Sequence, residues 1–212
     1  MRITKFGHAC VRLEHAGVRL VIDPGMFTEV DAVAGADALL ITHEHPDHYT
    51  ADLLRASDAP IVTIDAVARK IAAEAPELAS RVRVVAPGEL LDLGLPVTVV
   101  GELHAVIHPD LPRFSNSGYL VGLGDATVYH PGDSLTLPEV RVDVLCGPAS
   151  APWLKASEAV DFARAVAAPR NLAIHDRIYT EAAHGILQTQ MDALLPSGQS
   201  WQRIPDGSDL DL

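Results

Sequence analysis

Four side chains of the kinds that bind metal ions lie within one short segment that follows an apolar stretch, residues 37–42. They are His43, His45, Asp47 and His48. Side chains two residues apart at the end of a strand point the same way, so His43 and His45 can bind one ion from one side. Because the chain then turns at a proline, Asp47 and His48 face a neighbouring point. Imidazole and carboxylate groups together suit zinc first, and iron or manganese second.

A histidine-rich polar surface loop is the alternative interpretation of this segment. The density of ligand-type side chains argues against it, and so does the apolar run that precedes them, which predicts a buried strand. The spacing His-x-His-x-Asp-His resembles the signature of the metallo-β-lactamase superfamily. Further motifs match the family in its order, around Asp23 before this segment and around His104, Asp133 and His175 after it, so that the resemblance extends from residue 2 to about residue 195.

The resemblance implies sites for two metal ions that share one carboxylate. The ligands of the first ion would be His43, His45 and His104, those of the second would be Asp47, His48 and His175, and Asp133 would bridge the two. Two divalent ions about 3.5–4 Å apart can share a hydroxide and stabilise both the attacking and the leaving oxygen. We therefore expect two Zn²⁺ ions per chain, with Mn²⁺ or iron as alternatives.

Three residues are the predicted catalytic residues. Asp47 would orient the attacking hydroxide and accept its proton. His108 competes with His104 as a ligand, or else contacts the substrate or supports a ligand. His8 either lines the site or has a structural role, and the segment around it, Phe6-Gly7-His8-Ala9, is most similar to a small bacterial branch of lactonase-like and uncharacterised hydrolases.

We expect supporting or structural roles for several residues outside the implied ligand set. We expect Asp23 to orient a ligand histidine rather than to bind metal. Trp153 either lines a pocket or packs in the core, and Arg113 either attracts an anionic substrate or is a surface charge. Cys10 and Cys146 are expected to be small buried apolar residues.

The remaining pattern predicts the elements that position these residues. The apolar alternation predicts a strand over 2–14 paired with 18–22, and a second hairpin between 119–123 and 127–130. Further strands are expected at 61–64, 82–85, 89–93, 96–102, 142–146 and 172–175, and helices at 51–57, 65–75, 157–168 and 180–195, with Thr50 and Asp65 as caps of the first two helices. Two similar halves favour two sheets packed face to face, and the resemblance implies an α/β fold of the four-layer αββα type. We expect one domain over residues 1–212, ending in a polar tail at 196–212 that is partly ordered through Trp201.

Composition limits the class of protein. The net charge of −12 disfavours a nucleic-acid partner, because phosphate contacts need clustered Lys and Arg. Two cysteines are too few for a disulfide framework, and no apolar run is long enough to span a membrane. With no signal peptide apparent, we expect a cytoplasmic protein with a small-molecule substrate, and the oligomeric state stays open.

The resulting hypothesis is a binuclear metal-dependent hydrolase, in which a metal-bound hydroxide cleaves a small ester, lactone or phosphodiester. The chain differs from better-known branches of the family that it resembles. It has Asp133 where the best-known lactamases have cysteine. Residues 176–212 leave little room for the helices that glyoxalase II enzymes add. Two alternatives stay open. One is a non-haem iron redox enzyme similar to sulfur dioxygenases of this fold, and the other is a non-catalytic metal-binding module.

Overall fold

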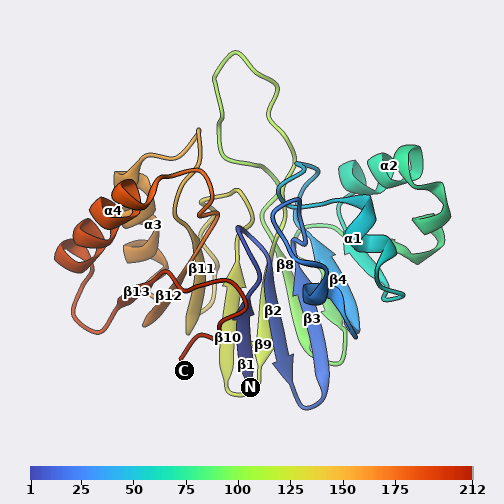
Figure 1. The fold of residues 1–212 in the computed structure, drawn as a ribbon, viewed down its shortest axis with the longest axis horizontal. Helices are drawn as coiled ribbons and strands as arrows, with labels where there is room; N and C mark the ends of the chain where they lie inside the picture. Colours follow the sequence, from blue (N-terminus) through green and yellow to red (C-terminus); the bar gives the residue numbers. More distant parts are fainter. Residues whose placement is uncertain (212) are drawn as a thin grey trace.

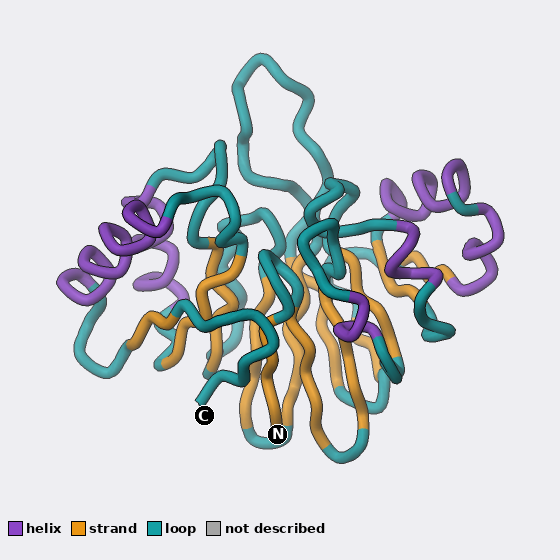
Figure 2. The backbone as a smooth tube through the Cα atoms, viewed as in Figure 1, coloured by secondary structure: helices purple, strands orange, loops and turns teal. Residues whose placement is uncertain are grey.

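The computed structural model describes residues 1–211, which form two β-sheets with helices on their outer faces (Figures 1 and 2). The first sheet has the order β1-β2-β3-β4-β5-β6. Its strands are β1 (Arg2–Lys5), β2 (Val11–His15), β3 (Val18–Ile22), β4 (Ala38–Ile41), β5 (Ile61–Thr63) and β6 (Val82–Val84). The second sheet has the order β13-β12-β11-β10-β9-β8-β7. Its strands are β7 (Leu90–Asp92), β8 (Pro96–Val100), β9 (Gly118–Leu123), β10 (Ala126–His130), β11 (Val144–Pro148), β12 (Arg170–Ile174) and β13 (Ser200–Gln202).

The helices complete the predicted αββα layers. Helices α1 (Ala51–Arg55) and α2 (Asp65–Glu74) and the 3₁₀ segments η1 (Val30–Val33) and η2 (Pro76–Arg81) lie beside the first sheet. Helices α3 (Ala156–Val166) and α4 (Glu181–Leu194) lie beside the second sheet, on the opposite side of the molecule in Figure 1. None of the helices in residues 1–211 has the length and apolar character that crossing a bilayer requires.

The core lies between the sheets, and the alternation along each strand explains it. In β3, Leu20 and Ile22 face the other sheet, while Val21 packs with the helices outside. In β4, Leu40 faces inward, while Leu39 packs outward. Because successive strand residues point to opposite faces, a strand buried on both faces reads as a continuous apolar run. This burial is why the segment before His43 is uniformly apolar.

The sequence prediction was wrong in two local details. Residues 2–14 form two antiparallel strands, in which Ile3 is opposite Leu13, instead of one strand. The chain reverses between them because Gly7 and His8 have positive φ angles of 86° and 47°. Asp65 does not cap α2; it is the first helical residue and forms an ion pair with Arg69. The second hairpin and the cap at Thr50, which accepts a hydrogen bond from the Leu53 amide, are confirmed.

The ends of many strands meet at one edge of the sandwich. Strands β3, β4 and β5 run parallel to one another, as do β10, β11 and β12, so the carboxyl ends within each set point the same way. The long connection from β8 to β9, residues 101–117, projects beyond this edge at the top of Figure 1. Loops at this edge therefore bring together residues that lie far apart in the sequence.

The C-terminal segment is more ordered than a polar tail suggests. Strand β13 pairs with β12 and buries Trp201, as expected. Beyond it, the chain runs along β1, where the amide of Lys5 donates to the carbonyl of Ser208 and the amide of Leu210 donates to the carbonyl of Ile3. Residues 206–210 therefore cover the free edge of the first sheet.

Candidate metal centre

Two groups of histidine and aspartate side chains converge at the edge where the strands end. The first group consists of His43, His45, His104 and Asp133, and the second group consists of His8, Asp47, His48 and His175. Within each group the potential ligand atoms all lie within 4.8 Å of one another. The structure thus brings together all the residues that the resemblance implied as ligands, and it adds His8 to the second group.

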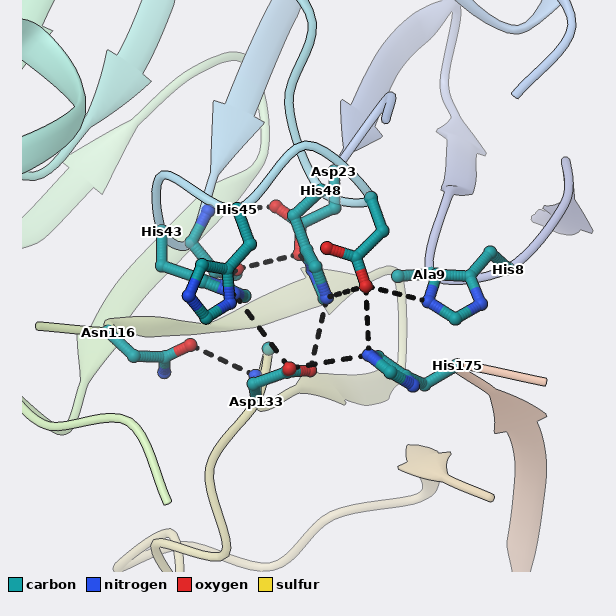
Figure 3. Close-up of polar contacts among 12 residues, drawn as sticks. His8, Ala9, Asp23, His43, His45, His48, Asn116, Asp133 and His175 are labelled. Carbon is teal, nitrogen blue, oxygen red and sulfur yellow. Dashed lines mark hydrogen bonds and ion pairs between the residues drawn. The ribbon is translucent and has the colours of Figure 1, made fainter. Parts of the chain in front are cut away.

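Asp133 lies between the two groups and contacts both (Figure 3). Its Oδ2 atom is 3.3 Å from the Nε2 atom of His104 and 3.3 Å from the Nε2 atom of His175. Its Oδ1 atom is 3.1 Å from the Nε2 atom of His48. One carboxylate can therefore serve a cation in each group.

Glycines allow the loops that carry these residues to approach closely. A Cβ atom at Gly25 would lie only 1.9 Å from the carbonyl oxygen of Asp47. At Gly132, where φ is +62°, a Cβ atom would lie 2.4 Å from the Oδ1 atom of Asn116. The amide of Asp133 donates to this same Oδ1 atom at 3.0 Å. Asn116 thus fixes the backbone that carries Asp133. Its role was not identifiable from the sequence, because an isolated Asn in a polar loop belongs to no motif.

Four of the five histidines expected to bind metal share a pattern of hydrogen bonds. In each, Nδ1 lies beside an acceptor outside the two groups: the Oδ2 atom of Asp23 for His48 at 2.7 Å, the carbonyl of Ala105 for His104 at 2.6 Å, the carbonyl of Ser150 for His175, and the hydroxyl of Thr42 for His43 at 3.0 Å. A proton on Nδ1 leaves the Nε2 lone pair directed to the centre. His45 differs, because its Nδ1 atom faces the centre, 3.0 Å from the Nε2 atom of His43. Asp23 has the contact that the sequence analysis expected of it.

Several of the converging atoms have no hydrogen-bond partner although they are buried. They are the Nε2 atoms of His48, His104 and His175 and the Oδ1 atom of Asp133. Buried polar atoms without a partner are costly. These atoms lie close together without hydrogen bonds to one another, and divalent cations held by the two groups would satisfy them. The residues present therefore fit a metal centre.

The charges of the centre also suit a cation. Burial raises the pKa of Asp133, but His175 and His48 outweigh this effect and hold it well below its ordinary value. Burial likewise raises the pKa of Asp47, and hydrogen bonds with His175 and His8 outweigh it, so the net shift is again downward. Both carboxylates are therefore anionic at neutral pH. Burial lowers the pKa of His43, which keeps its imidazole neutral, as metal binding requires.

The other predicted residues lie in different surroundings. The side chain of His108 is 59% exposed on the projecting loop, outside both groups, and its Nδ1 atom accepts from the Asp110 amide. Trp153 donates from Nε1 to the Oδ2 atom of Asp133 at 3.1 Å. Arg113 donates from Nε to the carbonyl of His104 at 2.6 Å, so it supports a loop that carries a predicted ligand. Both cysteines are buried, as expected.

Comparison with known proteins agrees with this geometry. The β-lactamase superfamily domain matches residues 2–175 of the chain. Protein Rv0786c of Mycobacterium tuberculosis is 40% identical over 215 residues, which cover 98% of each chain. The UPF0173 metal-dependent hydrolase PAE2160 of Pyrobaculum aerophilum is 29% identical, and the match covers 67% of this chain and 65% of that protein.

A solved structure shows the same fold. Igni18, a metallo hydrolase from Ignicoccus hospitalis, superposes with a TM-score of 0.73 at 16% identity, over 99% of this chain and 97% of that chain. At this identity the likeness concerns the fold alone. With the domain match over most of its length and relatives that are metal-dependent hydrolases, the chain belongs to the β-lactamase superfamily, among its metal-dependent hydrolases.

Proposed function

We propose that the chain is a binuclear zinc hydrolase that cleaves a small, uncharged carboxylic ester or lactone. The observation that carries this proposal is the position of Asp133, whose two oxygens contact the two groups of potential ligands. The ligands proposed for one zinc ion are His43, His45 and His104, and those for the other are Asp47, His48 and His175. Imidazole and carboxylate donors in this number leave positions for water and substrate.

The chain's own residues divide the work of such a reaction. Two zinc ions, when bound, acidify water and polarise a carbonyl group. Asp47 is the more accessible of the two carboxylates, because its side chain is 20% exposed whereas that of Asp133 is 3% exposed. We therefore assign to Asp47 the orientation of the attacking water and the acceptance of its proton. Trp153, which donates to Asp133, keeps that carboxylate in place.

The rim of the centre favours an uncharged acyl compound over a phosphodiester. The ring of Phe114 lies 4.5 Å from that of His45, and the ring of Trp153 lies 5.6 Å from that of His104. The projecting loop exposes apolar side chains beside them: Val106, Ile107 and Leu111. Nearby arginines are engaged elsewhere, Arg113 with a backbone carbonyl and Arg177 with Asp206. Exposed apolar groups next to a polar centre typically mark a binding surface for apolar ligand groups.

Initial rates on matched substrates test this proposal. Zinc-loaded protein is assayed with an aryl ester series, a lactone series and an aryl phosphodiester. We expect hydrolysis of the first two classes, with kcat/KM rising as the acyl chain lengthens, and at least a hundredfold loss in a His45→Ala variant. A His15→Ala variant is the matched control, because that histidine ends β2 and lies outside both groups. Full activity in His45→Ala, or activity on the phosphodiester alone, would overturn the proposal.

A further inference from the structure

His8 joins the second group without belonging to any ligand motif. It is fully buried, and its Nε2 atom lies 3.1 Å from the Oδ2 atom of Asp47. Its ring centroid is 4.0 Å from that of His175. Position alone is compatible with two roles, because a fourth protein ligand and a hydrogen-bond donor to a ligand would both lie here.

The opposite ring atom of His8 distinguishes these roles. The backbone amide of Arg177 donates to the Nδ1 atom of His8 at 3.2 Å. An atom that accepts a hydrogen bond carries no proton, so a neutral His8 must carry its proton on Nε2. A doubly protonated ring would carry a proton on Nδ1 as well, so the same contact excludes the cationic form. Its Nε2 atom therefore faces Asp47 with an N–H group and has no lone pair for a metal ion.

This pattern is the reverse of the one found in His48. There Nδ1 faces the Asp23 carboxylate, and Nε2 is left without a hydrogen-bond partner. His104 and His175 follow the same arrangement, with backbone carbonyls as acceptors. We infer that His8 is not a metal ligand but a positioning residue, whose Nε2–H group donates to Asp47 and fixes the orientation of that carboxylate. This inference goes beyond the proposed function, because it holds whichever ion and substrate the centre takes.

The turn that carries His8 is held on both sides, as a positioning role requires. The carbonyl of His8 accepts from the amide of His175 at 2.9 Å. The carbonyl of the next residue, Ala9, accepts from the Nε2 atom of His130 at 2.8 Å. On the other side, a Cβ atom at Gly7 would lie 2.3 Å from the carbonyl oxygen of Phe27, so the turn packs directly against the backbone. The direction of the His8 ring is therefore set by the backbone around it.

Nitrogen NMR of the histidine rings tests the inference in zinc-loaded, full-length protein. Long-range proton–nitrogen spectra report which ring nitrogen carries a proton, and the signals of His8 are those that disappear in His8→Gln. We expect His8 to be protonated on Nε2, while His48 is protonated on Nδ1. A His8 ring with its proton on Nδ1 and a zinc-shifted Nε2 would overturn the inference.

Zinc affinity, measured by chelator competition, is the second test. Gln can donate from a side-chain amide but cannot replace imidazole as a ligand, so the two roles predict different results for His8→Gln and His8→Ala. We expect the Ala variant to bind the weaker zinc ion about 10- to 100-fold less tightly. The Gln variant should recover most of that loss, and His108→Gln should match the wild type. Equal losses in the Gln and Ala variants would contradict a donor role, and if the Ala variant fails to fold, the NMR result on the wild type still decides.

Discussion

The two groups of the metal centre are built in different ways. In the first group, His43 and His45 follow directly from the regular strand β4, and none of its four residues has a positive φ angle among the described residues. In the second group, His8 and His175 have φ angles of 47° and 52°, and Asp23, which holds His48, has 52°. Left-handed backbone at non-glycine residues costs roughly 1–3 kcal/mol each and persists only where the surroundings enforce it.

The difference shows where each group obtains its support. The first group is supported by Thr42, next to His43 in the chain, and by Asn116, which lies 17 residues from Asp133. The second group depends on distant parts of the chain. Next to His175, Asp176 forms an ion pair with the buried Lys5 at 3.1 Å, and Lys5 also contacts Asp206 in the C-terminal segment at 2.7 Å. We therefore expect changes in that segment to affect the second group first.

Replacement of Asp133 should have the largest effect on activity. Because this carboxylate contacts both groups, its loss should weaken metal binding in both of them. In Asp133→Asn the side chain keeps its shape but loses the charge that both groups contact. We expect kcat/KM to fall by roughly a thousandfold, as for loss of a central electrostatic group. Metal analysis of the same preparation should find both ions bound more weakly. A variant that loses only one ion would show that Asp133 belongs to a single group.

Replacement of Asp23 should lower the metal affinity of the second group and leave that of the first group nearly unchanged. Asp23→Asn weakens the acceptor beside His48 but touches no member of the first group other than through Thr42. We expect zinc affinity of the second group to fall about 10- to 100-fold, with the first group within a few fold of the wild type. Competition with a chromophoric chelator measures both affinities, and equal losses at the two would contradict the separation.

The pH dependence of the free energy of unfolding should show how much the Asp176–Lys5 ion pair, next to His175, stabilises the protein. Burial raises the pKa of Asp176, but Lys5 and Arg203 outweigh this effect and hold it below its ordinary value. A carboxyl with a lowered folded-state pKa stabilises the fold above its unfolded pKa, about 3.9, and this stability is lost as pH falls through the folded value.

Asp176→Asn should therefore be less stable than the wild type by about 2 kcal/mol at pH 7. The difference should shrink as the pH falls below about 4. Urea unfolding of metal-free protein at a series of pH values measures it. A stability difference that grows on acidification would contradict the assigned sign.

The smallest effect is expected from the indole of Trp153. Trp153→Phe keeps an aromatic ring near His104 but removes the N–H group that donates to Asp133. One such hydrogen bond is worth about 1 kcal/mol, so kcat/KM should fall roughly fivefold. Because Asp133 serves both groups, the zinc affinities should change together, and a change confined to the second group would be unexpected.

The same contrast explains what the sequence could predict. The residues from His43 to His48 were identifiable because their spacing is local and follows a strand, and the positions of many strands follow from the apolar pattern. The turn at His8 was not, because the segment 2–14 alternates as one strand would and its reversal depends on contacts with Phe27 and His175. Asn116 contributes through its side-chain oxygen, which accepts from the Asp133 amide, and Arg177 through its own backbone amide; no residue pattern predicts either contact.

His108 is a second case in which the sequence could not decide the role of a residue. Sequence position alone could not separate it from His104, since the two are four residues apart in one loop. In the structure the chain turns so that His104 is buried beside Asp133, while His108 is exposed on the loop. The choice between them depended on the path of the loop and not on residue type.

The zinc content of the protein tests the central claim most directly. Protein purified without a tag or chelator is analysed by inductively coupled plasma mass spectrometry, and the Asp133→Asn variant is analysed beside it. The account predicts about two zinc ions per wild-type chain and fewer than one in the variant. A single ion per wild-type chain, mainly iron, or a folded protein that takes up no metal when zinc is offered, would contradict it.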